Sequence, residues 1–296
     1  MVKKVLIIGA TGMVGQPITD QLIRDGHQVT ALVRDIARAR QKLSQSVSLV
    51  KGDIEDRESL HAPLANTDAV VIIMPLSVND AGDFNAERDG TENIASALPA
   101  WKRIEILKLS EIGAGSDPSF FDLDCKAKAE QTIRNTGHPF VIFRPTWFME
   151  AWCDQLRVNN NLIVVGSSKR NIHWVALSDM GRWISNALTR FNTISGMILT
   201  AQGRDALSFA EAAEKIATAT GLSVLQLPIE DVVPPGSSLG LQRTLRELFY
   251  YYDREPEPFE AQELWRILGE PQCSFDEFVQ QVGPVLRSKF LSTEHS

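Results

Sequence analysis

The sequence predicts an α/β protein with a Rossmann-type, doubly wound parallel sheet and a smaller, mostly helical C-terminal lobe. Short runs rich in Val and Ile alternate with amphipathic stretches up to about residue 150, and this alternation loosens afterwards. A glycine motif joins the first apolar run to the first amphipathic stretch. Strict alternation of strands and helices is typical of a parallel sheet covered by helices on both faces.

Each expected strand is an apolar run that stops at a turn signal. The first strand, residues 3–8, ends at Gly9, and a helix over 13–25 follows with Val14, Ile18 and Leu22 on one face. Further elements are expected as strands at 28–33, 47–53, 68–75, 103–110 and 138–145, and as helices from near Asp35, at 83–98 and at 122–136.

The chain divides near residue 150. Residues 1–150 are expected to form the Rossmann domain and residues 151–296 the lobe, with parts of 172–200 packing back on the sheet. In this second part we expect a strand and helix at 172–190, strands at 196–200 and 224–228, and a helix at 208–220. The remainder of the chain reads as mostly helical.

The glycine motif is GATGMVG at residues 9–15. It follows a strand and opens a helix, which is the context that a dinucleotide-binding loop requires. Gly9 permits the tight turn, Gly12 lets the backbone approach a pyrophosphate, and Gly15 lets helix and strand pack together. The pyrophosphate would lie at the helix amino end, beside Thr11, Met13 and Val14. The alternative is a glycine-rich turn without a ligand.

The tip of the second strand bears on the choice of cofactor. NAD-binding proteins usually place Asp or Glu at this tip, where the carboxylate bonds the ribose 2′-hydroxyl. Here Arg34 comes first and Asp35 follows, and a guanidinium can grip a 2′-phosphate. We therefore expect NADP(H) rather than NAD(H). Asp53, with Ile54, is placed either to contact the adenine or simply to form a turn.

Several stretches together carry a family resemblance. They are GATGMVG at 9–15, LVRD at 32–35, GDIED at 52–56, IIMP at 72–75, LS at 109–110 and KAKAEQTIRNTGHPFVIFRPTWF at 126–148. The chain resembles the NmrA-like group of atypical short-chain dehydrogenase/reductases, and more distantly the isoflavone reductase-like enzymes. The resemblance implies a Rossmann core and a small substrate lobe. The group contains NADPH-dependent reductases and also regulators that bind a dinucleotide without turning it over.

Ordinary members of the wider family use a Tyr-x-x-x-Lys pair, and this chain lacks its tyrosine. Asp122 stands four residues before Lys126, where the tyrosine would be, and the three tyrosines form one run, Tyr250–Tyr252. The usual chemistry is excluded unless that run folds back into the site. The resemblance implies that Lys126 either binds the nicotinamide ribose or, with a pKa lowered by its surroundings, acts as the general acid. A plain surface lysine is the third alternative.

Ligands of open α/β sheets bind beyond the carboxyl ends of the strands. Trp147, Phe148 and Trp152 follow the sixth strand and would form an aromatic substrate wall, or else pack in the core of the lobe. The complete set of expected cofactor contacts is Gly9, Thr11, Gly12, Met13, Val14, Arg34, Asp53, Ile54, Met74, Pro75, Ser110, Lys126, Pro145 and Phe148.

Composition excludes several other classes. A net charge of −7 argues against nucleic acid as a partner. The five histidines are scattered without metal-ligand spacing, so no metal site is expected. Three dispersed cysteines favour a reducing compartment. The amino end lacks a signal-peptide pattern and the chain lacks an 18-residue apolar run, so a cytoplasmic protein is expected.

Two functional hypotheses remain. The first is an NAD(P)H-dependent oxidoreductase that transfers a hydride to a small carbonyl, quinone or enone without the usual tyrosine; solvent can supply the proton. The second is a redox sensor that binds NADP(H) and acts through a protein partner. The missing tyrosine favours the sensor, and the aromatic residues after Pro145 favour the enzyme. The sequence does not fix the oligomeric state.

Overall fold

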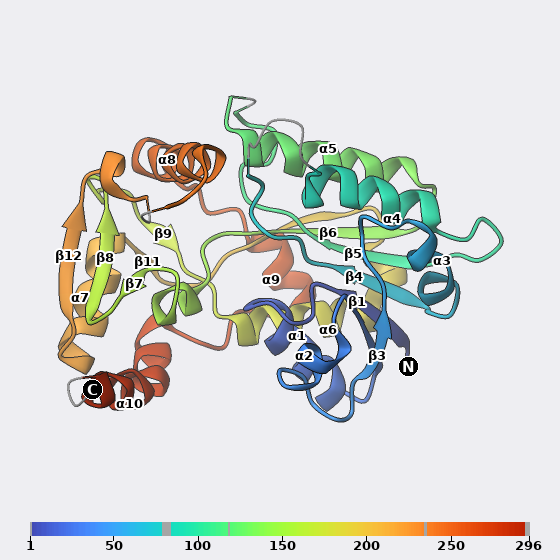
Figure 1. Ribbon diagram of the computed structural model, residues 1–296, viewed down its shortest axis with the longest axis horizontal. Coiled ribbons are helices and arrows are strands. Elements are labelled where there is room, and N and C mark those ends of the chain that lie inside the picture. The colour runs from blue at the N-terminus through green and yellow to red at the C-terminus, as the bar shows by residue number, and fades with distance from the viewer. Residues whose placement is uncertain (1, 79–83, 118, 234–235, 294–296) are drawn as a thin grey trace.

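The computed structural model describes residues 2–78, 84–117, 119–233 and 236–293. Its main feature is a seven-stranded sheet, with all strands parallel, in the order β10-β6-β5-β4-β1-β2-β3 within the described residues (Figure 1). The strands are β1 (Lys4–Ile8), β2 (Gln28–Val33), β3 (Ser48–Lys51), β4 (Ala69–Ile72), β5 (Glu105–Leu109), β6 (Phe140–Pro145) and β10 (Ile198–Ala201).

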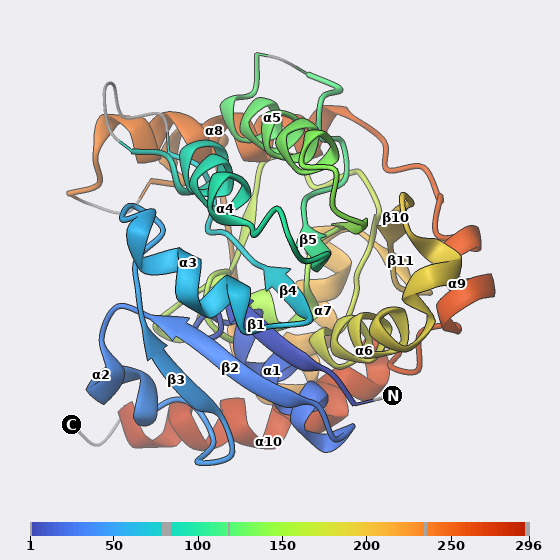
Figure 2. The same ribbon diagram turned by 90° about the vertical axis from the view of Figure 1, so that its right-hand side faces the viewer.

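Helices cover both faces of this sheet (Figure 2). One face packs on α1 (Gly15–Arg24), α2 (Ile36–Arg40), α6 (Leu177–Ile194) and α9 (Gln262–Leu268). The other face packs on α3 (Glu58–Ala65), α4 (Thr91–Ala97) and α5 (Phe121–Asn135), and a π-helical turn, η1 (Ala86–Gly90), leads into α4. The central strands are buried on both faces, which explains why β1 and β4 read as continuous apolar runs. The predicted Rossmann-type fold is confirmed.

The C-terminal lobe contains more strands than expected. Its three-stranded sheet has the order β12-β8-β7, and β9 pairs with β11. The elements are η2 (Met149–Cys153), β7 (Arg157–Val158), β8 (Asn161–Val165), β9 (Ile172–His173), β11 (Ala206–Leu207), α7 (Phe209–Thr220), β12 (Ser223–Leu227), η3 (Ile229–Asp231), α8 (Leu239–Arg254) and α10 (Phe275–Thr293). The apolar run 162–165 was the signal for β8 that the sequence interpretation overlooked.

The chain returns twice from this lobe to the main sheet. β10 pairs in parallel with β6 as the edge strand, and α6 packs against α1. Later α9 packs against β10. None of the helices in the described part of the chain combines the length and the apolarity that a bilayer-spanning segment needs.

The helix α8 connects the lobe to the amino end of α5 (Figure 1). The backbone N–H of Phe121 donates to Glu247 Oε2 at 3.3 Å. The rings of Phe120 and Tyr251 lie 5.9 Å apart between centroids. These contacts place the run Tyr250–Tyr252, which lies in α8, next to the segment that connects β5 with α5.

Candidate functional site

Each of the three glycines in the loop after β1 could be required for a different reason, which the surroundings of its missing Cβ atom indicate. Gly9 has φ 91°, and a Cβ atom there would lie 2.2 Å from the carbonyl oxygen of Ile73. A Cβ atom on Gly15 would lie 2.1 Å from the carbonyl oxygen of Gly9. The fold itself therefore requires glycine at both positions. A Cβ atom on Gly12 would meet nothing closer than 3.5 Å, so the protein alone does not explain this glycine.

The surroundings of Gly12 fit a bound pyrophosphate. Gly12 is exposed, and α1 begins three residues later. Val14 precedes α1 and offers no side-chain cap, and the first turn of the helix also lacks an acidic residue. An anion at this end would interact favourably with the helix dipole and with backbone N–H groups at the start of the helix. A side chain at Gly12 would occupy the space that such an anion needs.

The tip of β2 presents an available guanidinium. Arg34 is exposed and forms no ion pair with a residue of the described ranges. The neighbouring Asp35 accepts a hydrogen bond on Oδ1 from the backbone N–H of Arg38 at 3.0 Å, and so caps α2. Because the Asp35 carboxylate already caps α2, this arrangement favours Arg34 rather than Asp35 as the residue that would contact the 2′ position of the ribose.

Replacement of Arg34 by alanine is expected to remove most of a preference for NADPH over NADH. A charge-assisted contact to a 2′-phosphate is worth about 1.5–3 kcal/mol, or roughly ten- to a hundredfold in affinity. Fluorescence titration with both cofactors measures this preference. The matched control is Arg24→Ala, an exposed arginine at the last turn of α1. Equal affinities of the unmutated protein for NADPH and NADH would contradict the prediction.

Asp53 and Ile54 follow β3 in a tight turn. The carboxylate of Asp53 accepts from the backbone N–H of Glu55 at 3.1 Å. The carbonyl oxygen of Ile54 accepts from the side-chain amide of Asn93 at 2.8 Å, which ties the turn to α4. The turn alternative therefore describes part of what Asp53 does. Asp53 as a whole is half-buried.

Other expected cofactor contacts lie at the carboxyl edge of the sheet. Pro75 is exposed and Met74 half-buried after β4, whereas Pro145 is buried in register with Ala201. Ser110 follows β5 directly at the same edge. Its hydroxyl donates to Glu130 Oε1 at 2.6 Å, and Glu130 also forms a two-point ion pair with Arg144 at 2.8 and 2.7 Å.

Next to Ser110 lies a group of charges, all of them buried except the half-buried Glu111, that we call the ionic cluster: Glu87, Lys108, Glu111, Asp122 and Lys126. Glu87 contacts the Nζ atoms of Lys108 at 2.6 Å and of Lys126 at 2.7 Å. The side chains of Glu87 and Lys108 are 0% exposed, and that of Lys126 is 7% exposed. Glu87 and Lys108 were missed in the sequence. The signal was Lys108, a charge inside the buried part of strand β5, between Leu107 and Leu109.

The pKa of Lys126 is raised, whereas a lysine that acts as a general acid needs a lowered pKa. Burial alone would lower the pKa of this ammonium group. The carboxylate of Glu87, followed by that of Asp122, outweighs burial and raises the pKa above its ordinary value. Lys126 thus remains charged over the neutral range, and the expected lowered pKa is corrected.

Asp122 occupies the position of the missing tyrosine and is fully buried. Its Oδ1 accepts from the backbone N–H of Ser77, in the segment after β4, at 2.6 Å. The tyrosine run does fold back to this place. The hydroxyl of Tyr252 donates to Glu111 Oε1 at 3.1 Å, and that of Tyr251 lies 3.4 Å from Ser116 Oγ. Tyr250 is exposed and donates to Glu230 at 2.6 Å instead.

The two tryptophans after β6 have different surroundings. Trp152 has no exposed surface and packs on Trp174 at 5.6 Å between ring centroids, so it belongs to the lobe core rather than to a substrate wall. Trp147 is half-buried and lies edge-on to Tyr252 at 5.6 Å. Phe148 is half-buried and packs against the core beneath the sheet. Of the expected aromatic wall, only Trp147 contacts a residue that touches the ionic cluster.

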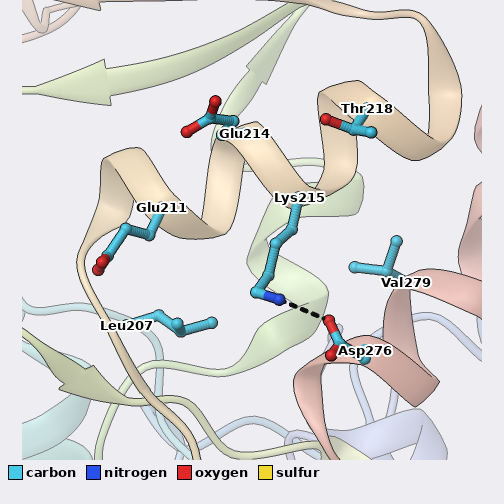
Figure 3. Close-up of a pocket in the computed structure, with 7 residues that line it drawn as sticks. All are labelled: Leu207, Glu211, Glu214, Lys215, Thr218, Asp276 and Val279. Atoms are coloured by element: carbon cyan, nitrogen blue, oxygen red, sulfur yellow. Dashed lines mark hydrogen bonds and ion pairs between the residues drawn. The ribbon is translucent and has the colours of Figure 1, made fainter.

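A surface pocket of about 420 Å³ lies elsewhere, between α7 and α10 (Figure 3). The ion pair of Lys215 and Asp276, 2.8 Å apart, crosses it. It is lined by Leu207, Glu211, Glu214, Lys215, Thr218, Asp276 and Val279. None of these residues belongs to the glycine loop or the ionic cluster, so we do not place the candidate active site here.

A parallel sheet with a glycine loop after its first strand and an uncapped helix behind it defines a dinucleotide-binding α/β protein. The chain belongs to a family described as NAD(P)H-binding, whose profile matches residues 9–189. The predicted class of cofactor and the resemblance noted in the sequence are thereby confirmed at the level of NAD(P)H binding. The preference for NADP(H) stays a prediction.

Known proteins resemble the chain over almost its whole length. It is 24% identical over 286 residues to the NAD(P)H azoreductase of Xenophilus azovorans, covering 93% of this chain and 96% of that protein. An NADPH-dependent quinone oxidoreductase of Escherichia coli, solved with NADPH, has a TM-score of 0.75 at 18% identity over 94% and 99% of the two chains. The triphenylmethane reductase of Citrobacter has a TM-score of 0.74 at 16% identity over 95% and 99%. These structures share the fold.

Proposed function

We propose that the protein is an NAD(P)H-dependent reductase of the atypical short-chain type. Its substrate would be a small carbonyl compound, a quinone or an enone. The similarity to an NAD(P)H azoreductase over both whole chains supports a reductase. The observation that carries the proposal is the ionic cluster at the carboxyl edge of the sheet.

The position of this cluster relative to the glycine loop is the main argument. β4 pairs with β1 on one side and with β5 on the other, and both of these strands lead into candidate site residues. A dinucleotide with its pyrophosphate at Gly12 would run across the end of β4 towards Ser110. Its nicotinamide, which supplies the hydride when bound, would then lie beside the ionic cluster. Buried charges are costly and gather at reaction centres.

Lys126 binds the nicotinamide ribose in this proposal. The Lys126→Met variant is expected to weaken NADPH binding by about tenfold or more, because a charged hydrogen bond is lost. Glu87 would keep Lys108 as its partner in this variant. The matched control is Lys128→Met on the same helix, since the Lys128 side chain is 56% exposed and its ammonium group pairs with Asp124. The control should leave the dissociation constant of NADPH unchanged. Unchanged NADPH affinity with collapsed turnover in Lys126→Met would give this lysine a role in proton transfer instead.

The substrate side would be formed by Trp147 and Tyr251, which are both half-buried. Tyr251 packs edge-on against Tyr252 at 5.2 Å, and Trp147 contacts the same ring. Aromatic faces of this kind bind flat conjugated molecules through apolar contact and stacking.

The deciding assay follows NADPH oxidation at about 340 nm, where reduced nicotinamide absorbs. The panel contains a quinone, an enone, an aldehyde and an azo dye. Turnover of one of these compounds, lost together with NADPH binding in Gly12→Val, is the expected result. Tight NADPH binding with no reduction of any compound in the panel would contradict the proposal and favour the redox sensor.

A further inference from the structure

Glu111 forms a hydrogen bond that joins the edge of the main sheet to the C-terminal lobe. It follows β5 directly after Ser110, and it is half-buried. Its Oε1 accepts the hydroxyl hydrogen of Tyr252 from α8 at 3.1 Å. Its carboxyl group also lies against the carboxyl group of Asp122 on α5. Two carboxyl groups in contact repel each other when both are ionised, and they attract when they share a proton.

One bound proton would balance the charges of the ionic cluster. Two ammonium groups, on Lys108 and Lys126, face three carboxyl groups, on Glu87, Glu111 and Asp122. With every group ionised the cluster carries one excess negative charge in a buried place, which is costly. One added proton makes the cluster neutral.

The hydrogen bonds of Asp122 indicate where that proton lies. Oδ1 of Asp122 accepts from the N–H of Ser77. Oδ2 is buried and has no hydrogen-bond partner among the described residues. A buried acceptor without a donor is costly, and a protonated Glu111 carboxyl would supply the missing donor. Glu111 would then accept from Tyr252 and donate to Asp122, so all three groups would be satisfied.

We propose that Glu111 is held as a carboxylic acid by Asp122 and donates the proton that completes the reduction of the substrate. Tyr252 acts as a positioning residue that orients the Glu111 carboxyl group from the C-terminal lobe. The inference rests on the proposed reductase function and names the proton donor of that same site. It assigns to Glu111 the part that the missing tyrosine plays in ordinary members of the wider family.

The step balances in atoms and charge. When one atom of the substrate double bond accepts the hydride supplied by bound NADPH, the electron pair of that bond moves to the other atom. The O–H bond of Glu111 breaks, and a new bond to hydrogen forms at that second atom. Glu111 is left as a carboxylate and regains its proton from water. The net change is the addition of one hydride and one proton to the substrate.

The groups that face Glu111 set the pH at which it works. Burial raises the pKa of the Glu111 carboxyl well above its ordinary value, and the Asp122 carboxylate raises it further. The Lys126 ammonium and the hydrogen bond from Tyr252 act in the opposite direction. The protonated form is the active one here, so turnover should fall as the pH rises through this raised pKa.

The first test needs no substrate. The infrared difference spectrum between the wild type and Glu111→Gln at neutral pH should contain the C=O band of a protonated carboxylic acid in the wild type only. The matched control is Glu58→Gln, an exposed glutamate at the start of α3, which should leave this band in place. Absence of such a band in the wild type at neutral pH overturns the proposal.

The second test measures the pH profile of turnover in three variants. Glu111→Gln should reduce turnover by about 10²–10⁴-fold and remove the alkaline limb, with NADPH affinity retained. Asp122→Asn removes the like charge and should move that limb to lower pH. Tyr252→Phe removes a hydrogen bond that favours the carboxylate and should move the limb to higher pH. Tyr250→Phe, on the exposed side of α8, should move nothing.

The outcomes separate this inference from the function on which it rests. A wild-type protein that turns over substrate, with Glu111→Gln equally active and showing the same pH profile, overturns the inference alone. Shifts of the limb in the same direction for Asp122→Asn and Tyr252→Phe also overturn it. A wild-type protein that reduces nothing in the panel overturns the reductase function, and the donation step fails with it.

Discussion

Gly12→Val is expected to fold like the wild type and to lose NADPH binding. A Cβ atom at this position has its nearest neighbour at 3.5 Å, so the free protein accommodates a side chain. The isopropyl group would occupy the place of the pyrophosphate above the amino end of α1. Fluorescence titration should show at least about a hundredfold weaker binding, which corresponds to about 2.7 kcal/mol. Thermal melting followed by circular dichroism should show an unchanged Tm.

Gly15→Val provides the contrast. Its Cβ atom would lie 2.1 Å from the Gly9 carbonyl oxygen and 2.8 Å from the Ala10 Cα atom, both of which are backbone. Overpacking against backbone is costly, so this variant should be strongly destabilised or should not fold. If Gly12→Val bound NADPH with normal affinity, the pyrophosphate would have to bind elsewhere.

Glu87→Ala is expected to destabilise the protein by about 3–5 kcal/mol, because removing one partner leaves buried charge uncompensated. Glu87 is the shared counter-ion of Lys108 and Lys126, and Lys108 has no exposed surface. Urea unfolding measures the loss. Glu58→Ala is the control, since the Glu58 side chain is 80% exposed and its replacement should change the free energy of unfolding by less than about 0.5 kcal/mol. A loss as small as that of the control would contradict the prediction.

The lowered pKa of Glu87 predicts that the free energy of unfolding depends on pH. Burial tends to raise the pKa of the Glu87 carboxyl, but the ammonium groups of Lys108 and Lys126 lower it below its ordinary value. A carboxyl group with a lowered pKa stabilises the fold fully above its unfolded-state pKa, and this contribution is lost as the pH falls through the folded-state pKa. The wild type should therefore lose stability towards acid pH more steeply than Glu87→Gln.

The main sheet and the glycine loop could be predicted because each is encoded locally. The apolar runs at 3–8 and 68–75 contain β1 and β4, and the Gly9–Gly15 motif needs only its own strand and helix. Parallel strands buried on both faces are continuous in hydrophobicity, which makes this class easy to recognise. The strand β8 was missed because one apolar run of four residues does not distinguish a strand from a buried helix.

The ionic cluster could not be predicted in full because its members come from separate elements. Glu87 belongs to η1, Lys108 to β5 and Lys126 to α5, and no spacing in the sequence relates them. Trp152 and Trp147 present the same difficulty, since only packing distinguishes a core tryptophan from one beside a site. Lys108 was the one local clue, because a lysine in a strand buried on both faces needs a partner.

The edge strand β10 is synthesised long after its partner β6. β6 is complete at Pro145, but its partner β10 ends at Ala201, so the ribosome must make the first part of the lobe before the sheet gains its last strand. At roughly 5–20 residues per second this leaves β6 as an open edge for several seconds. Its apolar residues Val141 and Phe143 are fully buried once folding is complete. A chain released near residue 150 would keep this edge exposed and should aggregate by strand pairing.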